Sequence, residues 1–140
     1  MTNTIAIRRI LAAALAVFLG LNGLVMLFAS LWWFGAVPGV TSTGMFNSHF
    51  VKDVGAAYLV AAAGLGWFAW KPGHGWPAAV AGTAFFVLHA LIHIIGATLG
   101  LGCGGGMGLP EIIRDFPGVY LPTLLALWVV ARKPAPSLGA

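Results

Sequence analysis

The sequence has very few charged side chains. Asp, Glu, Lys and Arg make up only 7% of its 140 residues, whereas about a quarter of a typical soluble domain is charged. So few charges cannot cover a globular surface, and this excludes a water-soluble monomer. Hydrophobic residues make up 60% of the chain, which also excludes intrinsic disorder, because disorder requires low hydrophobicity and high charge.

The sequence also has only one cysteine and lacks several common catalytic motifs. Cys103 is the only cysteine, so a disulfide within the chain is excluded. The sequence contains no Gly-x4-Gly-Lys phosphate loop, no Gly-x-Ser-x-Gly elbow and no His-Glu-x2-His zinc motif. What remains is an integral membrane protein, and its length leaves room for about four spans and their loops.

Long uncharged stretches separate the few charges. They predict four helices, each crossing a hydrocarbon core of roughly 30 Å. The predicted spans are 9–34, 49–70, 76–100 and 110–131, joined by loops rich in Gly, Pro and hydroxyl residues. The sequence therefore predicts an all-α integral membrane four-helix bundle, with residues 1–140 forming a single transmembrane domain in contact with the lipid bilayer.

The positive charges predict the orientation of the bundle. Five of them fall on one side of the four-span arrangement, namely Arg8, Arg9, Lys71, Arg132 and Lys133. The positive-inside rule makes that side cytoplasmic. We therefore expect a multi-pass protein of the bacterial inner (plasma) membrane with both termini in the cytoplasm. Topology explains the basic excess, so nucleic acid is not an expected partner; a homo-oligomer and a larger membrane complex both stay open.

A weak internal repeat links the second and fourth spans. Residues 52–59 and 114–121 both read as a basic residue, Asp, four small or apolar residues, Tyr and Leu. At the same offset His49 aligns with Glu111. The repeat predicts two tandem helical hairpins related by an axis along the membrane normal. Coincidence in an apolar background is the alternative.

Three pairs of ionisable residues recur at i, i+4 spacing. They are His49 with Asp53, His89 with His93, and Glu111 with Asp115. Residues four apart share one face of a helix, and the predicted topology places all three pairs in the outer half of the bilayer. Because ionisable groups at membrane depth are costly, they mark a functional site by default. Lys52 and Arg114 stand beside the pairs as charge partners.

Imidazoles and carboxylates from facing helices are the ligands of metal sites in helical bundles. The three pairs therefore predict an outward-facing site for a transition metal, with Cu, Zn or Fe as candidates. Haem is less favoured, because His89 and His93 share a helix face and cannot ligate one iron from opposite sides. We expect at least one of these two histidines to lie within coordination or hydrogen-bond distance of a member of the other two pairs.

Several functions fit such a site. A bound metal would serve metal handling or membrane redox chemistry. The same side chains could instead form a hydrogen-bonded network that fixes helix register in a cofactor-free accessory or assembly subunit. A small-solute or proton transporter is the third alternative, because histidine titrates near neutral pH. Whether the chain is an enzyme stays open, and no residue is assigned a catalytic role.

Three segments carry a resemblance to known proteins. The stretch from Pro38 to Asp53, together with Leu88–His93 and Asp115–Tyr120, resembles a group of small bacterial four-span proteins. In architecture that group is similar to the broad DoxX-like class, which includes subunits of quinone-linked oxidoreductases. The resemblance implies a four-helix membrane bundle and favours a redox role, but fold-level similarity assigns no catalytic residue.

Overall fold

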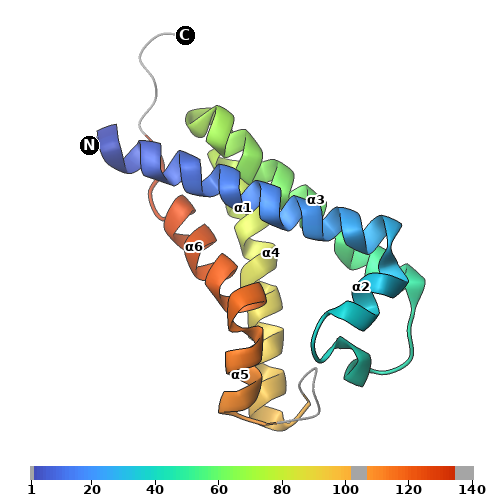
Figure 1. The fold of residues 1–140 in the computed structure, drawn as a ribbon. Coiled ribbons are helices and arrows are strands. Elements are labelled where there is room, and N and C mark those ends of the chain that lie inside the picture. The colour runs from blue at the N-terminus through green and yellow to red at the C-terminus, as the bar shows by residue number, and fades with distance from the viewer. Residues whose placement is uncertain (1, 102–106, 135–140) are drawn as a thin grey trace.

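The structure is a computed structural model that describes residues 2–101 and 107–134, and these residues form helices and loops without any strand. In chain order the elements are α1 (Thr2–Phe28), α2 (Ser30–Ala36), the 3-10 turn η1 (Val40–Thr43), α3 (Ser48–Trp70), α4 (Pro72–Leu99), α5 (Leu109–Asp115), the π-helical segment η2 (Phe116–Tyr120) and α6 (Leu121–Val130). The predicted all-α bundle is confirmed (Figure 1).

Four stretches of the described residues are long and apolar enough to cross a membrane. They are Asn3–Phe28, Ser48–Trp70, Pro72–Leu99 and Leu109–Val130. Many large hydrophobic side chains of these stretches are exposed on the surface of the protein. Such a surface is expected where helices face lipid tails rather than water. The chain is therefore a multi-pass membrane protein, and three of its four spans closely match the predicted ranges.

The first predicted span, 9–34, is wrong as a single helix. The helix ends at Phe28, the backbone turns at Ala29 (φ −133°, ψ 43°), and α2 folds back against α1. The indole N–H of Trp33 donates to the side-chain oxygen of Asn22 at 2.9 Å. In a continuous helix, residues 11 positions apart would lie roughly 16 Å from each other along the axis. An uninterrupted apolar run contains no signal for this break.

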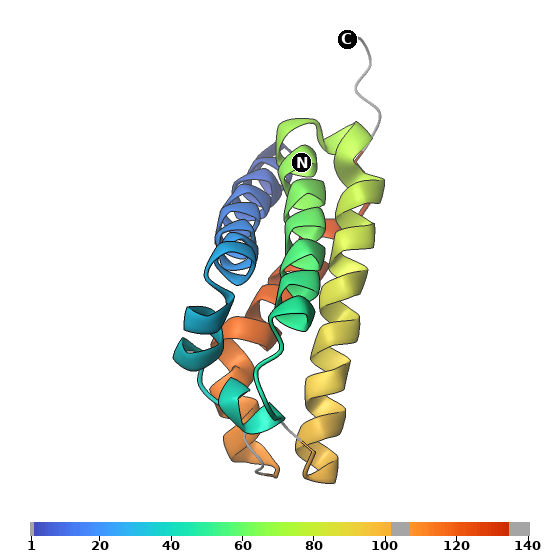
Figure 2. The same cartoon turned by 90° about the vertical axis from the view of Figure 1, so that its right-hand side faces the viewer.

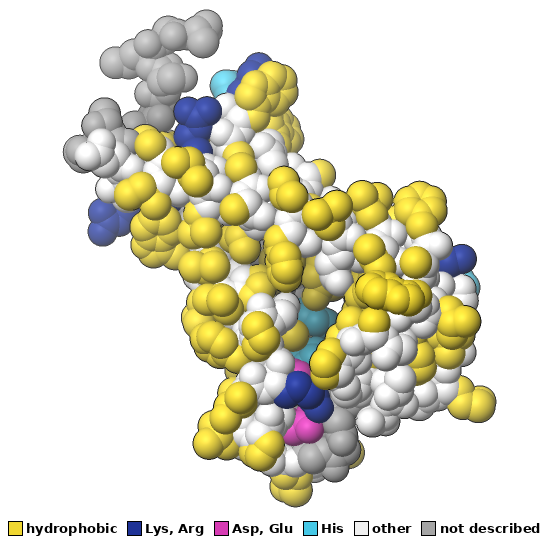
Figure 3. Space-filling model, viewed as in Figure 1, with side chains coloured by type: hydrophobic (Ala, Val, Ile, Leu, Met, Phe, Trp, Pro, Cys, Tyr) yellow, Lys and Arg dark blue, Asp and Glu magenta, His cyan; other side chains and the backbone are white. Residues whose placement is uncertain are grey.

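The two ends of the bundle carry opposite charge. The beginning of α1, the end of α6 and the turn between α3 and α4 lie at one end (Figures 1 and 2). This end, called the basic end below, carries Arg8, Arg9, Lys71, Arg132 and Lys133. The acidic residues lie towards the opposite end, where α3 and α5 begin (Figure 3). The predicted separation of charge along the bundle is therefore present.

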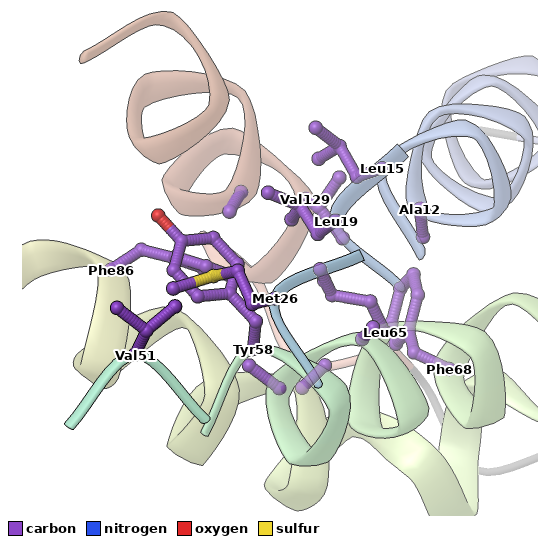
Figure 4. Close-up of a cluster of buried hydrophobic side chains, with 14 residues drawn as sticks. Ala12, Leu15, Leu19, Met26, Val51, Tyr58, Leu65, Phe68, Phe86 and Val129 are labelled. Atoms are coloured by element: carbon purple, nitrogen blue, oxygen red, sulfur yellow. The ribbon is translucent and has the colours of Figure 1, made fainter. Parts of the chain in front are cut away.

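The core is formed where α1, α3, α4 and α6 cross (Figure 4). Leu19, Leu65 and Phe68 are fully buried there. Glycines allow the backbones to approach closely, as small residues do in membrane helix pairs. A Cβ atom on Gly82 would lie 2.9 Å from the Cα and the carbonyl oxygen of Ala61, so α3 and α4 form a tightly packed hairpin.

The fourth span is one helical stretch with a widened turn in its middle. The N–H of Leu121 donates to the carbonyl of Phe116, five residues earlier, which is the π-helical pattern of η2. Pro117 and Pro122 lack an N–H and cannot continue the regular i to i−4 hydrogen bonding. Widened turns of this kind often occur near functional sites. Here the turn follows directly after Asp115, whose side chain contacts His93 of α4.

Candidate functional site

Helices α4 and α5 bring a histidine and an aspartate into direct contact. The Nδ1 atom of His93 lies 2.6 Å from Oδ2 of Asp115. The two side chains are only 13% and 10% exposed, although both belong to membrane-spanning helices. The expectation that a histidine of the third span contacts a member of another pair is confirmed by this hydrogen bond.

Arg114 extends the contact into a network of charges. Its Nε donates to Oδ1 of Asp115 at 2.9 Å. Its two terminal nitrogens donate to the two carboxylate oxygens of Glu111, at 2.9 Å and 2.6 Å. A guanidinium group that is hydrogen-bonded on two sides by carboxylates is held in one orientation. One arginine therefore fixes both acidic side chains of α5.

The loop that follows α2 covers this arginine. Gly39 has a φ of +85°, and a Cβ atom built on it would lie 2.7 Å from Cζ of Arg114. A residue with a side chain would meet both a strained backbone conformation and a steric conflict with the guanidinium group. The loop can therefore lie against Arg114 because position 39 is glycine.

His89 continues the cluster one turn further into the bundle. Its ring lies 4.8 Å from the ring of His93, centroid to centroid, and is stacked on Phe85 at 5.9 Å. Tyr58 of α3 presents its ring nearly perpendicular to His89 at 6.0 Å. Aromatic rings thus surround the polar group on the side of the core. We call His89, His93, Glu111, Arg114 and Asp115 together the α4–α5 cluster.

The hydrogen bonds of Asp115 determine which nitrogen of His93 carries a proton. A carboxylate is only an acceptor, and Asp115 already receives a hydrogen bond from Arg114. The Nδ1 atom of His93 must therefore be the donor in the contact with Asp115. In the neutral imidazole this leaves Nε2 with a lone pair. The cluster consequently holds a nitrogen that could accept a proton or bind a metal ion.

The cluster lies next to a hollow in the surface. Figure 3 shows this hollow between the α5–α6 side and the α2 side of the molecule, below α1. Histidine side chains are visible at its floor, and basic and acidic side chains lie at its lower edge. A ligand in the bilayer could therefore approach the histidines from the side of the bundle.

The structure keeps the pair His49 and Asp53 away from this cluster. Their side chains are 86% and 65% exposed and contact each other, with Nδ1 of His49 3.1 Å from Oδ2 of Asp53. The buried face of α3 contains Val51, Gly55 and Tyr58. Asp53 follows Val51 by two positions, which places it about 200° around the helix, on the opposite face. The expected convergence of three pairs is therefore wrong for this pair; Lys52 is exposed as well.

The expected metal ligands do not form a complete set. Among residues 2–101 and 107–134, no group of three or more His, Cys, Asp or Glu side chains is arranged to hold a metal ion. The physical reason is that Arg114 hydrogen-bonds both Glu111 and Asp115, and its positive charge would repel a bound cation. Metal binding remains a prediction. Cys103, a further soft donor in the sequence, lies outside the described residues.

Two parts of the site could not be identified from the sequence. Tyr58 belonged only to the internal repeat, and Phe85 lies in a long apolar stretch with other aromatic residues, so neither carried a signal that it contacts His89. Gly39 carried a weak signal, because it follows Pro38 in a segment with typical turn composition. No known family, curated protein or solved structure matches the chain.

Proposed function

We propose that the chain is a bacterial inner-membrane protein, with both termini in the cytoplasm, that accepts protons from a lipid-soluble hydroquinone in membrane redox chemistry. The observation that carries this proposal is the 2.6 Å hydrogen bond between His93 and Asp115. The positive charges at the basic end support the orientation, which places the α4–α5 cluster in the outer half of the membrane.

The His93–Asp115 pair has the features of a general base. An aspartate that accepts from Nδ1 holds the imidazole in one tautomer and stabilises the imidazolium that forms when Nε2 takes up a proton. Histidine suits this task because its proton affinity lies near neutral pH. Nε of Arg114 donates to Oδ1 of Asp115, so the two oxygens of this carboxylate accept from Arg114 and His93. The arrangement therefore favours reversible proton uptake at His93.

A lipid-soluble hydroquinone fits the position of the cluster. The site lies within the membrane, opens to a lateral hollow and is lined by Tyr58 and Phe85, whose rings can contact a flat aromatic ligand. Oxidation of a hydroquinone releases two protons and two electrons, and Nε2 of His93 would accept the protons one after the other, the first leaving for the aqueous phase before the second is taken up. We place the electron acceptor, a redox centre, in a partner subunit. The resemblance to the DoxX-like class supports such a role.

Metal handling is the second candidate, and the same contact favours it. Histidines that bind metals commonly donate their other ring N–H to a carboxylate, as His93 does to Asp115. His93 and His89 would then offer two nitrogen ligands to Cu, Zn or Fe, and further ligands would have to come from water or from a rearranged carboxylate. The first candidate requires the purified protein to bind a quinol, and the second requires it to contain a metal. One experiment on the same samples can therefore separate them.

The experiment measures binding of decylubiquinol to the untagged protein in lipid nanodiscs under anaerobic conditions. We expect saturable binding that His93→Gln weakens at least tenfold, because glutamine cannot accept the proton as imidazole does. His49→Gln is the matched control, since it makes the same change in an exposed histidine that also contacts an aspartate. It should leave binding unchanged. Asp115→Asn and Asp53→Asn form a second matched pair.

Metal content of the same samples decides between the candidates. A stoichiometric metal that is lost in His93→Gln but retained in His49→Gln, without binding of decylubiquinol, would contradict the hydroquinone proposal and support metal handling. Absence of both decylubiquinol binding and metal would contradict both proposals and favour a cofactor-free accessory subunit. Equal binding in the wild type and His93→Gln would show that the quinol partitions into lipid and not into the cluster.

A further inference from the structure

A second polar site lies at the basic end of the bundle. Arg8 of α1 is only 7% exposed. Its Nε donates to the carbonyl oxygen of Val129 at 2.7 Å, and a terminal nitrogen donates to the carbonyl oxygen of Arg132. Carbonyl groups at the end of a helix lack partners within that helix. Arg8 therefore connects the beginning of α1 to the end of α6.

An open cavity of about 370 Å³ adjoins this arginine. It is lined by Thr4, Arg8, Trp128, Ala131 and Arg132. Two arginines thus line one cavity, together with a threonine and a tryptophan. Tryptophan and arginine are typical of the zone where lipid headgroups meet the hydrocarbon core.

The described residues that line this cavity include two arginines and no acidic side chain. The only acidic side chains of the sequence are Asp53, Glu111 and Asp115, and all three belong to the opposite end of the bundle. Arg8 and Arg132 consequently repel each other. An arrangement of two arginines without a carboxylate is stabilised when an anion enters from outside. Arginine binds phosphate oxygens with pairs of parallel hydrogen bonds, which makes phosphate the preferred anion.

We propose that this cavity binds the headgroup phosphate of an anionic phospholipid. The cavity lies where the first and last spans reach the membrane surface, so a phospholipid can enter it while its acyl chains stay in the bilayer. Basic groups near a membrane surface attract anionic lipids. The partially exposed ring of Trp128 adds an apolar contact next to the guanidinium groups. The site is independent of the α4–α5 cluster.

The test is native mass spectrometry of the full chain released from nanodiscs that contain equal amounts of phosphatidylglycerol and phosphatidylcholine. We expect the wild type to retain phosphatidylglycerol preferentially, and Arg132→Gln to retain at least fivefold less. Arg132 is exposed and contributes its backbone carbonyl to Arg8, so this variant keeps the contact with α1. Lys133→Gln is the matched control, because it removes a neighbouring charge that does not line the cavity.

Several outcomes would overturn the proposal. Equal retention of both lipids by the wild type would show that the cavity does not select an anionic headgroup. An equal loss in Lys133→Gln would show a general attraction to the basic end. Displacement of the lipid by millimolar inorganic phosphate would assign the cavity to a free anion. His93→Gln should retain phosphatidylglycerol like the wild type, so failure of this proposal is distinguishable from failure of the proposed function.

Discussion

At the scale of single residues, the contact between the loop after α2 and Arg114 depends on Gly39. An alanine at this position would combine a positive φ with a Cβ only 2.7 Å from the guanidinium carbon of Arg114. A left-handed backbone costs an L-residue about 1–2 kcal/mol. We expect Gly39→Ala to lower the free energy of unfolding by at least this amount, measured by denaturant titration in detergent micelles.

Gly35→Ala is the appropriate control for that substitution. Gly35 belongs to α2, and a Cβ there would have no neighbour within 4 Å. The variant should be as stable as the wild type or slightly more stable, because alanine favours a helix over glycine. Equal stability of Gly39→Ala and the wild type would show that the loop does not lie against Arg114.

Arg114 is the residue that holds the two acidic side chains of α5 in place. Arg114→Gln would leave the side chain of Glu111, which is only 7% exposed, without its two hydrogen bonds from arginine. Removal of one partner from a buried ion pair typically costs about 3–5 kcal/mol. We expect a loss of this size in the free energy of unfolding.

A second substitution identifies the cause of that loss. The double variant Arg114→Gln with Glu111→Gln should recover part of the stability, because it also removes the buried negative charge. If the double variant is no more stable than Arg114→Gln alone, the contribution of Arg114 comes from packing and not from its charge.

The residues of the site show what sequence spacing can reveal. The i, i+4 pattern correctly predicted that His89 and His93 lie close together, because that relation is internal to one helix. It could not reveal the direction in which a pair points. His49 and Asp53 have the same spacing but face away from the bundle, on the side of α3 opposite Val51 and Gly55. Direction depends on which neighbouring helix packs against each face.

At the scale of secondary-structure elements, the α3–α4 hairpin depends on close contact between backbones. A Cβ on Gly82 would lie 2.9 Å from the Cα of Ala61, so Gly82→Ala must move the two helices apart. Overpacking of a well-packed interior typically costs about 1–3 kcal/mol. We expect a lower midpoint of thermal unfolding in detergent for this variant.

Gly66→Ala controls for the gain in helix propensity. The nearest atom to its added Cβ is the Cβ of Ala16 at 3.7 Å, an ordinary contact distance. The midpoint of this variant should not fall. A similar decrease in both variants would indicate that the loss of a helical glycine, and not the closeness of Gly82 to Ala61, lowers the midpoint.

The elements were predictable where hydropathy alone determines them. Uncharged stretches predicted the second, third and fourth spans within a few residues, because a helix in lipid must be apolar over its whole length. Breaks within a span have a different origin. The turn at Ala29 is associated with the hydrogen bond between Trp33 and Asn22, which is a tertiary contact. The widened turn η2 had a local signal in Pro117 and Pro122, but proline alone does not distinguish a kink from a π-helical turn.

At the scale of the whole molecule, the separation of charge predicts the orientation in the membrane. The basic end should face the cytoplasm, so the connection between α4 and α5 should face the opposite compartment. Cys103 belongs to this connection. We expect a membrane-impermeant maleimide to label Cys103 in intact spheroplasts, and Cys103→Ser to abolish the signal. Labelling only after lysis would reverse the orientation and place the α4–α5 cluster on the cytoplasmic side.

The predicted repeat concerns the whole molecule as well, and it remains a prediction. Tyr58 and Tyr120 are both buried, as equivalent residues of two related hairpins would be. Asp53 is exposed, whereas Asp115 belongs to the α4–α5 cluster, so the aligned aspartates have different surroundings. If the halves share an origin, only one of them has kept its polar residues inside the bundle.

The central claim is that Asp115 fixes His93 with a bare Nε2 nitrogen. Nitrogen-15 NMR of the histidine-labelled protein in lipid bilayers tests it directly, with the His93 signals assigned by their loss in His93→Gln. We expect a neutral ring protonated at Nδ1, and a bare Nε2 whose shift moves when decylubiquinol is added, while the His49 signals stay unchanged. A His93 ring that carries its proton on Nε2 and does not respond to decylubiquinol would contradict the claim.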